Sequence, residues 1–128
     1  MLDMAFTLES SKSFDAVSSG LESAIPENGF RVLAIHDVQE TLKDKGFEIG
    51  PTKIIELCNA KFAYTALGKD VNVSLFMPCK IVVRTEGDKT IMTLARPTMI
   101  SQMLPDAGLE ELANGVEDIM KRIMDEVK

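Results

Sequence analysis

The chain has 128 residues, of which 45% are hydrophobic and 27% are charged, a composition typical of one folded domain (1–128) rather than of a disordered chain. The formal net charge of −6 repels phosphate backbones and anionic membrane surfaces, so we expect neither nucleic acid nor a membrane as a partner. Residues 1–10 lack the basic start and apolar run of an export signal, and two cysteines are too few for a secreted disulfide scaffold, so we expect a cytoplasmic protein with free thiols.

The chain begins with a predicted strand over residues 5–8, followed by a long helix. Apolar residues recur at helical spacing over 13–27, which predicts a helix with one apolar face. Ser13 is a good N-cap, and Asn28-Gly29 supplies the residues that end such a helix.

The middle of the chain predicts two strands and two short helices. Residues 30–35 and 52–58 have strand composition. A short helical pattern over 38–45 and a loop at 47–51 lie between them, because Gly50-Pro51 disfavours regular structure. A two-turn helix is predicted over 59–67, and from Val71 onward the sequence is predicted to be β again.

The last third contains the clearest hairpin in the sequence. Residues 79–85 and 89–95 predict two antiparallel strands joined by Glu86-Gly87-Asp88, with Ile81 and Val83 on one face. Pro97 ends the second strand, and a loop with Met99, Met103 and Pro105 leads to Asp106, a predicted N-cap. The final helix has apolar residues from Leu109 to Val127 on one face, with charged residues that include Glu117 largely opposite.

This order predicts an α+β fold: a strand, a long helix, four strands with two short helices between them, and a last long helix. We expect an antiparallel sheet of about five strands with the two long helices on one face. The other face would be solvated or covered by a partner. We expect Val82, Ile55 and Leu57 to form an apolar patch there, which favours a homodimer.

Three segments of the sequence carry a resemblance to a known family. They are residues 42–46 (Leu-Lys-Asp-Lys-Gly), residues 54–61 (Ile-Ile-Glu-Leu-Cys-Asn-Ala-Lys) and residues 75–83 (Leu-Phe-Met-Pro-Cys-Lys-Ile-Val-Val). The sequence resembles the family called domain of unknown function 302. The resemblance implies a small α+β domain with an architecture similar to that of the TATA-binding protein, often dimeric, with no established role. Ala60 replaces the Pro that usually follows Cys-Asn in the family, which removes a rigid start for the next helix. The DNA binding of the fold's namesake does not carry over with the fold.

Cys58 and Cys79 are the most distinctive candidate site residues. Cys58 closes a predicted strand just before a helix that starts at Asn59 or Ala60, where the helix dipole favours a thiolate. If the two strands are neighbours, the two thiols could share a ligand or a metal, although no Cys-x-x-Cys spacing points to zinc or thioredoxin-like chemistry. The alternative is that both cysteines are small buried core residues.

Other candidates surround this pair. Glu56 shares a predicted strand face with Cys58, as a further ligand or as a solvated side chain, and Tyr64 and Arg96 could line a pocket that recognises an anion. Met99 lies in the following loop. His36-Asp37 resembles a catalytic dyad, but neighbours on a strand point to opposite faces, so we assign it no catalytic role.

Three hypotheses for function follow. The first is a non-enzymatic module, acting as a homodimer, that binds a small ligand or a metal near Cys58, Cys79 and Met99. The second is a thiol-dependent enzyme or redox protein that uses Cys58 and Cys79. The third is a structural dimer whose partner covers the open sheet face. The sequence names no cofactor, metal or substrate.

Overall fold

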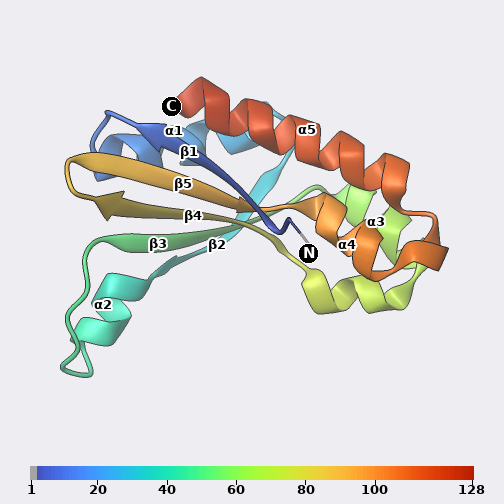
Figure 1. The fold of residues 1–128 in the computed structure, drawn as a ribbon, viewed down its shortest axis with the longest axis horizontal. Coiled ribbons are helices and arrows are strands. Elements are labelled where there is room, and N and C mark those ends of the chain that lie inside the picture. Colours follow the sequence, from blue (N-terminus) through green and yellow to red (C-terminus); the bar gives the residue numbers. More distant parts are fainter. Residues whose placement is uncertain (1–2) are drawn as a thin grey trace.

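The computed structural model describes residues 3–128 and contains one five-stranded sheet (Figure 1). The strand order is β1-β5-β4-β3-β2, and every neighbouring pair is antiparallel. The strands are β1 (Ala5–Ser10), β2 (Arg31–Asp37), β3 (Thr52–Cys58), β4 (Cys79–Glu86) and β5 (Lys89–Ala95). The predicted α+β class and the number of strands are confirmed.

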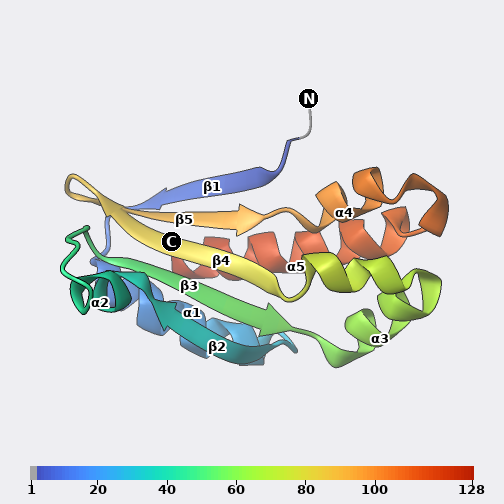
Figure 2. The same cartoon turned by 90° about the horizontal axis from the view of Figure 1, so that it is seen from below.

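Two long helices, α1 (Phe14–Glu27) and α5 (Glu110–Val127), lie side by side over one face of the sheet (Figures 1 and 2). The start of α1 is fixed as the sequence predicts, because Ser13 Oγ accepts a hydrogen bond from the Ala16 amide at 3.1 Å. Gly29 lies between the end of α1 and the start of β2, and its positive φ of 82° is a conformation that favours glycine after a helix.

The β4–β5 hairpin is confirmed. Glu86 pairs with Lys89 across the turn, where Gly87 has a φ of 60°. Ile81 and Val83 are fully buried, whereas Lys80 and Arg84 on the opposite face are partly exposed. The alternation follows from the period of two along a strand.

The core lies between the sheet and the two long helices. Its largest fully buried side chains come from α1, the three central strands and α5: Leu21, Ile25, Ile55, Leu57, Ile81, Met92, Leu94, Met120, Ile123 and Met124. Such close-packed aliphatic burial is the main stabilising contribution to the fold.

Three further helical segments lie beyond one end of the sheet, where Figures 1 and 2 show them grouped together. They are α3 (Ala60–Lys69), the 3-10 helix η1 (Val71–Phe76) and α4 (Pro97–Met103), which a second 3-10 turn, η2 (Pro105–Ala107), connects toward α5. The remaining helix, α2 (Val38–Lys43), projects from the opposite end and buries no side chain.

Three predictions in this region are wrong. The chain from Val71 is not β but 3-10 helical, because the Asp70 carboxylate accepts a hydrogen bond from the Asn72 amide at 2.8 Å and caps the turn. Residues 97–103 are not a loop, since Pro97 occupies the first helical turn, where its missing N–H costs nothing. Asp106 lies in η2, and the predicted N-cap there is wrong because α5 begins at Glu110 with no side-chain cap.

The predicted apolar patch on the open face is also wrong in part. Ile55 and Leu57 are fully buried beneath the helices, because their alternation places them on the core face. The half-buried aliphatic residues on the open face include Ile54 and Val82, which are paired across β3 and β4.

Candidate functional site

An apolar cavity of about 80 Å³ lies where the end of the sheet meets α3, η1, α4 and α5, and it is partly open to solvent. The sheet contributes Leu57 and Cys79 to its wall. The helical segments contribute Phe62, Ala63 and Ala66 from α3, Val73 and Phe76 from η1, Ile100 from α4, and Leu112, Ala113 and Val116 from the α5 side. Four separate stretches of chain therefore build one hollow.

Asn59 sets the position of the helix that forms one wall of the cavity. Its Oδ1 accepts a hydrogen bond from the Phe62 amide at 3.1 Å, and its Nδ2 donates to the Gly29 carbonyl at 2.9 Å. The side chain thus caps α3 and ties it to the end of α1. Because the oxygen and the nitrogen of the amide each make one of these bonds, Asn59 is held in place as part of the cavity wall.

The two cysteines both border the cavity, but they do not form the predicted pair. Both are free, and the strand register pairs Cys79 with Leu57, not with Cys58. Since successive side chains of a strand leave opposite faces, Cys79 is on the core face and Cys58 on the open face. Within residues 3–128, no group of three or more His, Cys, Asp or Glu side chains is placed to hold a metal ion.

Burial decides the chemistry of Cys79. Desolvation, with a smaller contribution from Cys58, raises the pKa of the Cys79 thiol to about 11, although the nearby Lys80 ammonium acts in the opposite direction. The side chain is therefore a neutral thiol at physiological pH and behaves as a small apolar group.

The other predicted site residues lie outside the cavity. Glu56 is on the open sheet face, where its carboxylate contacts His36 Nε2 from the neighbouring strand. Tyr64 is 80% exposed on the outer side of α3. Met99 is half-buried in α4, next to the cavity residue Ile100. The His36–Glu56 contact escaped the sequence analysis because it joins residues on two different strands.

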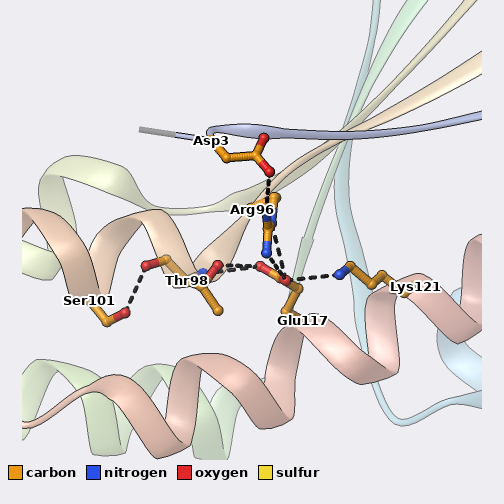
Figure 3. A network of polar contacts seen from close by, with 6 residues as sticks. All are labelled: Asp3, Arg96, Thr98, Ser101, Glu117 and Lys121. Atoms are coloured by element: carbon orange, nitrogen blue, oxygen red, sulfur yellow. Dashed lines mark hydrogen bonds and ion pairs between the residues drawn. The ribbon is translucent and has the colours of Figure 1, made fainter. Parts of the chain in front are cut away.

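Arg96 is held in a partly buried ionic network instead of a pocket (Figure 3). Its guanidinium donates to Glu117 Oε2 through Nη2 at 3.0 Å and Nε at 3.2 Å, and to Asp3 Oδ2 through Nη1 at 2.5 Å. Lys121 Nζ lies 3.1 Å from the same Glu117 oxygen. Arg96 thus joins the N-terminal segment, α4 and α5, so its charge is already matched by protein carboxylates.

Glu117 is at the centre of this network and is only 3% exposed, although its position on α5 was predicted to face solvent. Its Oε1 accepts hydrogen bonds from Thr98 Oγ1 at 2.7 Å and from the Thr98 amide at 3.2 Å. Burial acts to raise the pKa of Glu117, but the hydrogen bonds from Arg96, Thr98 and Lys121 outweigh it and lower the pKa to about 2. The carboxylate is therefore charged and fully paired, and it anchors α4 to α5 at the edge of the cavity wall.

Most of the cavity residues were missed by the sequence analysis. Phe62, Ala63 and Ala66 recur at helical spacing on one side of α3, and this spacing was the available signal. It predicts a buried helix face but not that a hollow remains beneath it.

The comparisons with known proteins agree with this fold. The profile of the family described as Domain of unknown function DUF302 matches residues 6–127. A solved structure, the crystal structure of an uncharacterised conserved DUF302 protein from Bacillus stearothermophilus, is similar to 99% of this chain and 100% of its own, with 30% sequence identity and a TM-score of 0.93. No curated protein matches the sequence. With nearly the whole chain matched in sequence and in structure, the protein belongs to the DUF302 family, a domain of unknown function.

Proposed function

We propose that the protein is a non-enzymatic module that binds a small ligand in the cavity between α3 and α5. Of the residues predicted from the sequence, Cys58, Asn59 and Cys79 border this space. Glu56, Tyr64, Arg96 and Met99 do not, so the proposal assigns them no contact with the ligand. Metal binding by the cysteines is not part of it, because a thiol with a pKa of about 11 seldom provides the thiolate that a metal requires.

The observation that carries the proposal is the cavity itself. Protein interiors are close-packed, and voids larger than a water molecule are few. Here an apolar hollow of about 80 Å³ remains partly open to solvent, so its wall forgoes the contacts that larger side chains would make. Larger side chains at Ala63, Ala66 or Ala113 would fill it, and a binding role explains why small residues stand there.

The thiol-dependent enzyme is the alternative from another class. Cys58 precedes the cap residue Asn59, as predicted, so it lies near the start of α3. Within residues 3–128, however, no hydrogen bond joins its sulfur to a histidine, lysine or carboxylate that could act as a base. This lack of a partner favours the binding module over nucleophilic catalysis.

We also propose that the module forms a homodimer through the open sheet face and resides in the cytoplasm. Ile54 and Val82 lie opposite each other near the centre of that face, where a second copy could cover them. Two free cysteines accord with a reducing compartment. Light scattering tests the dimer: we expect twice the chain mass for the wild type and a single chain mass for Val82→Lys, and a wild-type monomer would refute it.

Native mass spectrometry of freshly purified protein tests the binding function. We expect an added mass on the wild type that is lost in Ala66→Leu, whose longer side chain enters the cavity. Ala60→Leu is the matched control, since the same change on the same helix points to solvent and should leave the added mass in place. Identical spectra for wild type and Ala66→Leu, with or without an added mass, would contradict the proposal.

A further inference from the structure

We infer that the part of the ligand that enters the cavity is the end of a hydrocarbon chain. The inference rests on the proposed binding function and names the chemistry that this site accepts. It follows from three properties of the site: the scarcity of polar side chains in its wall, the absence of charged side chains from its described lining, and its size.

Among the described residues that line the cavity, Asn59 alone has a side-chain nitrogen or oxygen atom. Asn59 uses its amide oxygen and nitrogen on the Phe62 amide and the Gly29 carbonyl. Among the buried side-chain nitrogen and oxygen atoms of residues 3–128, none lacks a hydrogen-bond partner. A hydroxyl, amide or carboxylate that entered the cavity would lose its water without replacement, which is strongly unfavourable.

No Asp, Glu, Lys, Arg or His side chain is among the described residues that line the cavity. Cys79 contributes a neutral thiol, because its burial raises the pKa of the sulfur to about 11. Glu117, the buried carboxylate that joins α4 to α5, is paired with Arg96 and Lys121 and does not border the cavity. A neutral, apolar wall complements a neutral, apolar ligand group.

The size favours a chain over a ring. The volume of about 80 Å³ is roughly half of the ~150 Å³ cavity that accepts benzene in an engineered protein core. A few methylene groups fit this space, and because the cavity is partly open, the rest of a longer chain can remain outside. Each buried methylene should then add about 0.8 kcal/mol, which is about fourfold in affinity, until the cavity is full.

Straight-chain alcohols provide the test. The shift of methyl NMR signals from Leu57, Ile100 and Val116 should give an affinity for each 1-alkanol from ethanol to octanol. We expect the affinity to rise about fourfold per carbon over the first few carbons and then to level off. The matched probe is 1,6-hexanediol, which must bury a hydroxyl at its tip and should therefore bind at least tenfold more weakly than 1-hexanol.

Two variants test whether the alcohols bind in the cavity. In Ala66→Leu, the affinity for 1-alkanols should level off at a shorter alcohol than in the wild type, or binding should be abolished. In Ala60→Leu, the affinities for all the alcohols should equal those of the wild type. An affinity that does not depend on chain length, or equal binding of 1-hexanol and 1,6-hexanediol, would overturn the hydrocarbon inference. The proposed function would survive that result if native mass spectrometry showed a polar ligand that Ala66→Leu loses.

Discussion

The two long helices over the sheet and the short helical segments beyond its end are packed in very different ways. Helix α1 buries five residues and α5 buries seven, and the two helices approach so closely that a Cβ added at Gly20 would lie 2.8 Å from Val127 Cγ1. At the other end, α3 buries no residue fully and η1 buries only Val73. The long helices thus supply stability, and the short segments leave a space that can be occupied.

The first prediction compares a core residue of each region. Leu21→Ala removes a fully buried side chain from α1 and should lower the free energy of unfolding by about 3–4 kcal/mol. Phe62→Ala, in the half-buried wall of the cavity, should cost about 1–2 kcal/mol, because that side chain already borders empty space. Urea unfolding of both variants measures the difference. Equal losses would mean that both regions are packed alike.

The second prediction concerns the network that joins the two regions. Because the pKa of Glu117 is lowered from 4.5 to about 2 on folding, its stabilising contribution is present above pH 4.5 and is lost as the pH falls toward 2. The shift corresponds to about 3 kcal/mol. In Glu117→Gln, urea unfolding should show a loss of about that size at pH 7 and a weaker dependence on pH between 4.5 and 2. A variant with the wild-type acid dependence would contradict the role given to Glu117.

The third prediction concerns the reactivity of the Cys79 thiol, which borders the cavity. A pKa of about 11 instead of 9.0 reduces the thiolate fraction at neutral pH about 100-fold. With Cys58→Ser as background, iodoacetamide should therefore modify Cys79 at least ~100-fold more slowly in the native protein than in urea. Similar rates in both conditions would show that the cavity wall opens freely.

The smallest expected change in the free energy of unfolding concerns the close approach of α1 and α5 at Gly20. Gly20→Ala gains helix propensity but presses against Val127, so we expect a net loss of about 1 kcal/mol. In a Val127→Ala background the same substitution should become neutral or stabilising, because the clash is gone. A double-mutant cycle by thermal unfolding checks this coupling, and additive effects would contradict the close approach.

The regular parts of the fold could be predicted from the sequence because their signals are local. Ser13 and Asn28-Gly29 mark the ends of α1, and the alternation of Ile81 and Val83 marks the core face of β4. Residues 71–76 are the exception, because the alternation of Val71 and Val73 is typical of a strand, whereas the hydrogen bond from the Asn72 amide to the Asp70 carboxylate starts a 3-10 helix.

The site could be predicted only in part, for a related reason. Cys58 and Cys79 both border the cavity, but whether their sulfurs meet depends on strand register, which pairs Cys79 with Leu57. Glu117 looked like a surface residue, since its partner Arg96 lies 21 positions away in the chain. The cavity itself is a gap between four segments, and no single segment encodes it.

The most direct test of the ligand site is a crystal structure determined under xenon pressure. Xenon enters dry apolar cavities without needing a polar contact. We predict a xenon atom next to Cys79, between Phe62 of α3 and Val116 of α5, in the wild type and in Ala60→Leu, and none there in Ala66→Leu. A wild-type structure in which α3 packs directly against α5, with no xenon between them, would contradict the account.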